Sequence, residues 1–80
     1  MVRVVSRGPY SVYVYMEEDQ PHHLAHCEVR WPGHSTQVDL EELDVIVGEP
    51  IPRRALEVVR DHLEEIRAIW NRLNPRRPLR

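Results

Sequence analysis

The residues of this chain best suited to chemistry are histidines and carboxylates in its first half. Four of the five histidines lie within thirteen residues, at positions 22, 23, 26 and 34. Imidazole and carboxylate groups together form a shell that transition metals accept, and a bound metal ion can generate hydroxide for hydrolysis. The candidate metal ligands are His22, His23, His26, Glu28 and Asp39.

The spacing of these histidines matches no specific metal-binding motif. The pattern H-H-x-x-H over residues 22–26 differs from the helical H-E-x-x-H of metalloproteases. In the competing interpretation the histidines are exposed on a loop and a solvent-facing strand, and His26 pairs with Asp39. We favour this interpretation, so the sequence predicts no catalytic residue. The sequence does not identify a cofactor. We favour the absence of a cofactor over a divalent transition metal.

Arginines form a second set of candidates. All eleven basic residues are arginine, and a net charge of −2 gives no overall attraction to nucleic acid. One group begins a predicted helix, where free backbone amides and guanidinium groups can bind a phosphate. A second group follows that helix and can bind nucleic acid without sequence preference. The alternative is a solvated surface with a loose tail. The residues concerned are Arg53, Arg54, Arg76, Arg77 and Arg80.

The cysteine and the aromatic residues are further candidates for function, and each has an alternative interpretation as a packing residue. Cys27 is the single cysteine, which excludes an internal disulfide. Strand alternation points it into the core, where a thiol is inert. The aromatic residues could form a platform on which single-stranded bases stack, but packing between core and interface is the favoured interpretation. The aromatic residues concerned are Tyr10, Tyr13, Tyr15 and Trp31.

A helix is predicted over residues 52–73, because large apolar residues recur there at steps of three and four. Pro52 suits the first turn, where no amide donor is required. Asn74 can adopt a left-handed conformation and Pro75 cannot continue the helix, so the helix is predicted to end there. The apolar stripe consists of Leu56, Val59, Leu63, Ile66, Trp70 and Leu73.

Strands are predicted in the first half, where β-branched, aromatic and alternating residues are frequent. A pairing that sets Cys27 opposite Val38 places the apolar residues of two strands on one face. The same register sets His26 opposite Asp39 on the polar face. The predicted strands cover residues 2–5 together with 10–16, then 25–31, 35–40 and 45–47.

These elements predict a single α+β domain over residues 1–74, in which a three- to four-stranded antiparallel sheet is packed by one long C-terminal helix. Residues 75–80 are predicted to be a basic mobile tail. A chain of 80 residues buries only about 60% of its unfolded surface. We therefore expect a homodimer or a small hetero-oligomer with a protein partner. With no apolar run long enough for a membrane and no signal peptide, we expect a cytoplasmic location.

Several motifs follow one another in a recognisable order. They are SR…YSVYVYM, an acidic loop leading to proline, a histidine-bearing strand, a short strand ending in Val-Gly, and PRRAL opening a helix with Trp70 near its end. From Val5 to Leu79 this order resembles a small bacterial family, the domain of unknown function 4160 (DUF4160). Members typically carry a Pro-His-x-His-Val stretch. Here His26 stands at the first histidine and Glu28 replaces the second, so a two-histidine site would not be kept intact.

The resemblance implies a context rather than a chemistry, because the family is uncharacterised and its members are suspected components of toxin–antitoxin pairs. The leading hypothesis is a non-enzymatic binding module, one component of a toxin–antitoxin-like pair, with a protein partner and with nucleic acid as a further candidate. One alternative is a metal-dependent hydrolase or nuclease that uses the strand face of His26, Glu28 and Asp39. The other is a purely structural oligomerisation subunit.

Overall fold

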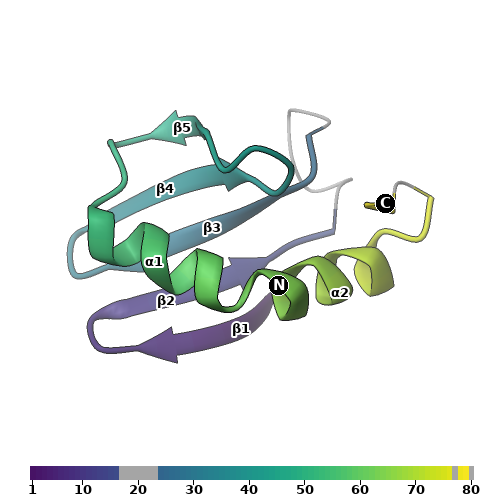
Figure 1. Cartoon of the computed structure of the whole chain (residues 1–80), viewed down its shortest axis with the longest axis horizontal. Helices are drawn as coiled ribbons and strands as arrows, with labels where there is room; N and C mark the ends of the chain where they lie inside the picture. The colour runs from purple at the N-terminus through teal and green to yellow at the C-terminus, as the bar shows by residue number, and fades with distance from the viewer. Residues whose placement is uncertain (17–23, 77, 80) are drawn as a thin grey trace.

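The computed structural model describes residues 1–16, 24–76 and 78–79. This part of the chain contains five antiparallel strands followed by two consecutive helices. The strands lie side by side in chain order, and both helices lie across one face of the sheet (Figure 1). The α+β class is therefore confirmed. The strands are β1 Val2–Arg7, β2 Tyr10–Val14, β3 His26–Trp31, β4 His34–Asp39 and β5 Val45–Gly48, and the helices are α1 Arg53–Asp61 and α2 Leu63–Leu73.

The sheet has more strands than the three or four predicted, because residues 2–16 form two strands. A tight turn at Gly8 and Pro9 joins β1 to β2, and Arg7 lies opposite Tyr10 across it. Gly8 has a φ of 58°, a left-handed conformation that glycine adopts without steric cost. The turn reverses the chain, so the two halves of the predicted segment become neighbours in an antiparallel hairpin.

The pairing of β3 with β4 follows the predicted register. Cys27 lies opposite Val38, and His26 lies opposite Asp39. The buried apolar side chains of the three central strands point to the face that the helices cover, as alternation requires. Those in the apolar core are Val12, Val14, Cys27, Val29 and Val38.

The helix predicted over residues 52–73 is divided into two at His62, which makes the prediction of one long helix wrong. At this residue φ is −119° and ψ is 19°, and its backbone N–H donates to the Val59 carbonyl oxygen at 3.3 Å. Helical bonding resumes where the Ile66 N–H donates to the His62 carbonyl oxygen at 3.0 Å. An unbroken helix of this length would extend about 33 Å. Because sheets twist, the break allows each half to lie along the sheet.

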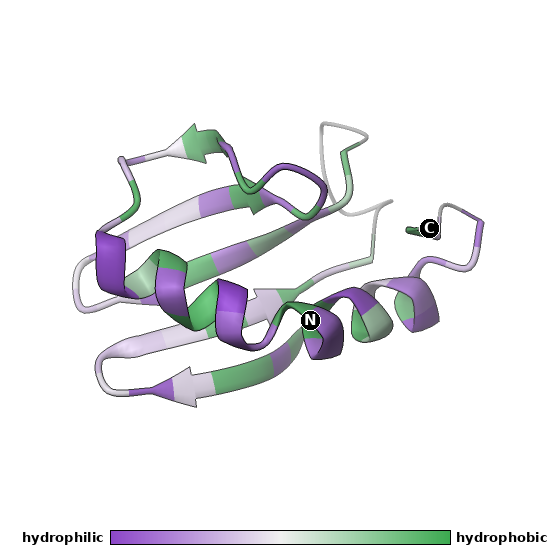
Figure 2. Ribbon diagram, viewed as in Figure 1, coloured by the Kyte–Doolittle hydropathy of each residue, from purple (hydrophilic) through white to green (hydrophobic). Residues whose placement is uncertain are grey.

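The break also changes which helix residues are buried. Figure 2 shows apolar and hydrophilic residues alternating along both helices. Three members of the predicted stripe, Leu56, Leu63 and Leu73, are only half-buried. Neither helix in the described ranges is long and apolar enough to span a membrane. The fully enclosed helix residues are Ala55, Val58, Val59, Ile66 and Trp70.

Asn74 ends α2 through hydrogen bonds and not through the left-handed conformation predicted for it. Its φ is −128° and its ψ is 63°. The side chain is 6% exposed, and its Nδ2 donates to the carbonyl oxygens of Tyr15 at 3.1 Å and Trp70 at 3.2 Å. Because Tyr15 directly follows β2, Asn74 joins the end of the helix to the end of a central strand.

The described part of the C-terminal segment contacts α2. The backbone N–H of Leu79 donates to Oδ1 of Asn71 at 2.6 Å, and Nδ2 of Asn71 donates to the Leu79 carbonyl oxygen at 3.4 Å. These bonds place residue 79 beside the last turns of the helix. The domain limit at residue 74 and the mobility of the segment after it stay predictions.

Gly48, at the end of β5, has the least room of the described glycines. Its φ is +110°, and a Cβ there would lie 2.9 Å from the Ser35 carbonyl oxygen and 2.9 Å from the Thr36 Cα. Both are backbone atoms, so no rotamer change relieves the contact. We expect Gly48→Ala to lower the free energy of unfolding by about 2 to 5 kcal/mol, from backbone strain and overpacking together.

Gly33→Ala is the matched control for this prediction. Gly33 also has a positive φ, 77°, but no atom lies within 4 Å of its Cβ position. Its substitution therefore introduces backbone strain alone, about 1 to 2 kcal/mol. Urea unfolding followed by circular dichroism measures both variants, and equal losses would show that the close approach at Gly48 is unimportant.

Candidate functional site

The structure buries His26, one of the candidate metal ligands. The side chain of His26 is fully buried, and its Nδ1–H donates to the Leu24 carbonyl oxygen at 2.8 Å. Its ring centroid lies 5.6 Å from that of Trp70. The prediction of a solvent-facing His26 is therefore wrong, because the bend at Leu24 and the end of α2 cover the first residue of β3. His22 and His23 lie outside the described residues.

Asp39 shapes a loop instead of facing solvent beside His26. Its Oδ1 accepts the backbone N–H groups of Glu41 at 3.0 Å and Glu42 at 2.6 Å, and its Oδ2 accepts that of Asp44 at 2.9 Å. Such side-chain-to-backbone bonds are typical of aspartate at turns. Among the residues that the structure describes, no three His, Cys, Asp or Glu side chains are grouped to hold a metal ion.

The environment of Asp39 favours its charged form. Burial, which by itself raises the pKa, is outweighed by backbone N–H groups that donate to the carboxylate, chiefly those of Glu42 and Asp44. The pKa of Asp39 is therefore lowered. A carboxylate whose oxygens already accept three N–H groups has little capacity left for a metal ion.

Arg67 of α2 attaches the same loop from the helix side. Its Nε and Nη2 donate to the Leu40 carbonyl oxygen at 2.9 and 2.6 Å. The loop over residues 40–44 is thus bonded both to the strand that precedes it and to the second helix. This stabilises the path of the chain into β5.

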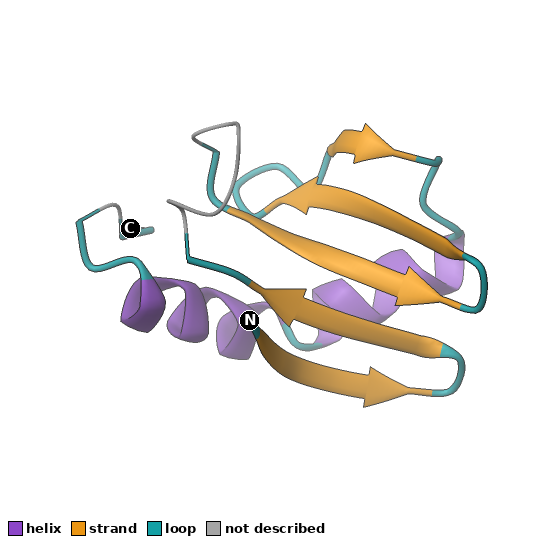
Figure 3. Ribbon diagram, turned by 180° about the vertical axis from the view of Figure 1, so that it is seen from behind, coloured by secondary structure: helices purple, strands orange, loops and turns teal. Residues whose placement is uncertain are grey.

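The face of the sheet opposite the helices carries a polar cluster, which we call the sheet-face cluster and define as Tyr13, Tyr15, Glu28 and Arg30. Figure 3 shows this face in front of the helices. The Tyr15 hydroxyl donates to Oε1 of Glu28 at 2.7 Å, and Arg30 donates to both of these groups. The guanidinium carbon of Arg30 lies 4.7 Å from the centroid of the Tyr13 ring, in cation–π contact.

The sheet-face cluster has no net charge. Burial raises the pKa of Tyr15, and the hydrogen bond to Glu28 raises it further. The hydrogen bond from Arg30 to Glu28 raises the pKa of that arginine. At neutral pH the cluster therefore contains neutral phenols, one guanidinium and one carboxylate. Its side chains are fixed by one another before any ligand arrives.

The predicted aromatic platform is divided between the two faces of the sheet. Tyr10 and Trp31 pack edge to face on the helix side, with ring centroids 6.2 Å apart. Tyr13 lies on the open face beside Arg30. The sequence does contain the signal for the sheet-face cluster, because Glu28 and an arginine two residues later must share a face of one strand. The metal-ligand role predicted for Glu28 overlooks this pairing with Arg30.

The arginines proposed to bind anions do not gather in one place. The Arg53 side chain is 93% exposed and lies 3.5 Å from the glutamate four residues later. Arg54 lines a hollow between α1 and the β1–β2 turn. Arg76 follows α2, at the opposite end of the helical layer (Figure 1). Arg77 and Arg80 lie outside the described residues.

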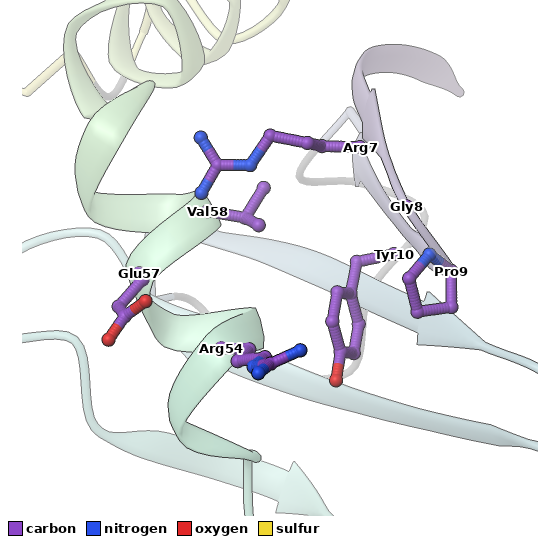
Figure 4. A pocket seen from close by; sticks show the side chains of 7 residues that line it. All are labelled: Arg7, Gly8, Pro9, Tyr10, Arg54, Glu57 and Val58. Atoms are coloured by element: carbon purple, nitrogen blue, oxygen red, sulfur yellow. The ribbon is translucent and has the colours of Figure 1, made fainter.

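The hollow lies between the turn that joins β1 to β2 and the first turns of α1. Figure 4 shows Arg54 and Tyr10 reaching toward each other from the helix and the hairpin, while Arg7 crosses toward α1. Nη1 of Arg7 lies 2.9 Å from Oδ2 of Asp61. Sequence reasoning missed Arg7 and considered Tyr10 only as part of an aromatic platform, because only the unexpected hairpin brings both residues to the helix. The hollow has a volume of about 260 Å³ and is lined by Arg7, Gly8, Pro9, Tyr10, Arg54, Glu57 and Val58.

The fold and its surfaces define a small α+β protein with a covered and an open sheet face. A family model described as a domain of unknown function (DUF4160) matches residues 10–71 of the 80. The chain therefore belongs to the DUF4160 family, as the order of its motifs predicted. A search of curated proteins and a search of solved structures each found no match.

The hydrogen bonds to Asp39 predict a pH-dependent contribution to stability. Asp39→Asn removes the charge but keeps the size, and we expect the free energy of unfolding near neutral pH to fall by about 1 to 2 kcal/mol. The folded pKa is lowered from an unfolded value of about 3.9. The advantage of the natural protein is thus fully present above that value and disappears as pH falls through the folded pKa. Urea unfolding between about pH 7 and pH 2 measures it.

Asp44→Asn is the control, since it removes the same charge from the same loop. The Asp44 side chain makes no hydrogen bond or ion pair within the described ranges, and Asp44 bonds to Asp39 through its backbone N–H and carbonyl oxygen alone. We expect a change within about 0.5 kcal/mol. If both variants lose stability with the same pH dependence, the bonds to Asp39 do not stabilise the loop.

Cys27 is predicted to be unreactive in the folded protein. Its side chain is fully buried, and burial raises its pKa to about 12. Because the thiolate is the reactive form, we expect a thiol reagent at about pH 8 to label the native protein no faster than the protein unfolds. In urea the same reagent should label one thiol per chain. Rapid labelling without denaturant would contradict the burial.

Proposed function

We propose that this protein is a non-enzymatic binding module, one component of a toxin–antitoxin-like pair, which contacts a protein partner through the open face of its sheet. The observation that supports this most directly is the sheet-face cluster. Tyrosine and arginine are enriched at the centres of protein interfaces, where a few well-packed side chains contribute most of the affinity. Here they lie on a face that neither helix covers.

Charge favours a protein over nucleic acid as the ligand of this face. Binding to phosphates depends on uncompensated lysine or arginine, whereas the guanidinium of Arg30 is paired with Glu28. The Tyr13 ring, which could stack on a base, already contacts that guanidinium. A protein surface with its own polar groups can instead contact a neutral cluster of this kind.

The same geometry gives little support to hydrolysis at the strand face. Of the three side chains assigned to it, His26 is buried, Asp39 bonds its own loop and Glu28 pairs with Arg30. Each is occupied in a different structural role. We therefore retain the binding hypothesis, with the chain acting in the cytoplasm as a homodimer or in a small hetero-oligomer.

The test is to co-express the chain with the protein encoded beside its gene and to measure the complex by size-exclusion chromatography with light scattering. We expect Tyr13→Ala to weaken the complex about tenfold or more, because it removes a central aromatic contact. Circular dichroism verifies that the variant is folded.

Arg60→Ala, on the exposed side of α1, is the matched control and should leave the affinity unchanged within about twofold. Equal weakening by both substitutions would place the interface elsewhere. The proposal would be contradicted if the chain stays monomeric, alone and together with the neighbouring protein, at concentrations well above micromolar. A homodimer that is insensitive to Tyr13→Ala would instead favour a structural subunit.

A further inference from the structure

We propose that the hollow between the β1–β2 turn and α1 binds the carboxylate group of a small monoanionic organic acid. The hollow lies on the helix side of the molecule, across the sheet from the sheet-face cluster. The inference is therefore independent of the protein-binding function proposed above. It rests on the unused donors of the hollow, on its local charge and on its size.

Two of the polar groups that line the hollow have no partner in the described part of the chain. Arg54 makes no hydrogen bond or ion pair there, and neither does the hydroxyl of Tyr10. Figure 4 shows these two side chains extending toward each other. A guanidinium presents paired N–H groups in a planar fork that matches a carboxylate, and a phenol can donate one further hydrogen bond.

Arg7 supplies a third donor group, which an ion pair directs toward α1. Its Nη1 donates to Oδ2 of Asp61 at 2.9 Å, which directs the side chain from the end of β1 toward α1. The remaining N–H groups of this guanidinium are available to a ligand, because a single contact to Asp61 uses only part of its five-donor fork. The hairpin and the helix thus each contribute a cation.

The local charge selects a monoanion. Of the charged groups that line the hollow, Arg7 is paired with Asp61 and Glu57 is paired with Arg53. The guanidinium of Arg54 is left as one positive charge without a counter-ion in the described part of the chain. A carboxylate neutralises that charge. A phosphate carries up to two negative charges at neutral pH, and the second would lie uncompensated near Glu57.

The size and walls of the hollow select a short ligand. Its volume of about 260 Å³ is below the range of roughly 300 to 1,000 Å³ that is usual for drug-sized ligands. Pro9, Val58 and the ring of Tyr10 provide apolar surface beside the charged groups. A carboxylate with a few carbon atoms fits both the charge and the volume, and an acid of this kind could be free or could be the carboxyl end of a peptide.

Nuclear magnetic resonance of the full chain tests the proposal. Sodium propionate is titrated against the backbone amide signals of residues 7–10 and 54–58, with sodium chloride at equal ionic strength as the reference. We expect saturable shifts in the millimolar range, in keeping with one small anion at an open site. An acetylated dipeptide with a free carboxyl end, compared with its amidated form, distinguishes a peptide source from a free acid.

Two variants assign the shifts to the proposed donors. Arg54→Gln should weaken the binding of propionate about tenfold, because it removes a charge-assisted contact. Tyr10→Phe keeps the ring that packs against Trp31 and removes only the hydroxyl, so it should weaken binding about threefold. Arg60→Gln removes the same charge from an exposed position of α1 outside the hollow and should have no effect.

Saturable shifts confined to these amides and lost in Arg54→Gln would support the site. Shifts that chloride reproduces, or that Arg60→Gln reduces as much as Arg54→Gln, would overturn it, because they would report only a general anion effect. Inorganic phosphate binding more tightly than propionate would overturn the monoanion assignment. If Arg54→Gln fails to fold, an unchanged affinity in Tyr10→Phe is sufficient to reject the proposal.

Discussion

The arrangement of this domain depends on the packing of Trp70 against the sheet. Its side chain is fully buried near the C-terminal end of α2, and its ring contacts that of His26 at the start of β3. Burying an aromatic side chain removes about 150 to 250 Å² from water. At about 25 cal/mol per Å² this contributes roughly 4 to 6 kcal/mol, which exceeds the contribution of about 0 to 1 kcal/mol from an exposed ion pair. Asn74 then bonds to the Trp70 carbonyl and to the end of β2, so the second helix is fixed at one end of the sheet.

This one-sided packing explains the contrast between the two faces of the sheet. Valines and Cys27 fill the side under the helices, while the other side bears side chains that bond to one another. The Glu28 carboxylate accepts from both Tyr15 and Arg30, so the sheet-face cluster is neutral without being apolar. A surface of this kind remains compatible with water while it presents defined side chains.

The sequence was most informative where one rule decides the structure. Register between β3 and β4 follows from alternation, since a one-residue slip would bury Asp39 and expose Val38. Alternation failed for His26, because a tertiary contact with Trp70 covers it, and no local pattern contains that contact. The break at His62 was also invisible, since the apolar spacing continues through it without a proline or glycine.

The strand order has a consequence for how the chain folds. Every pair of neighbouring strands is also consecutive in the sequence, so the sheet can grow one hairpin at a time with short loops to close. The side chains that cover it come last, since α2 begins only at Leu63. During synthesis the valine-lined face therefore stays uncovered until both helices have left the ribosome. In this interval the exposed apolar face favours aggregation and capture by chaperones.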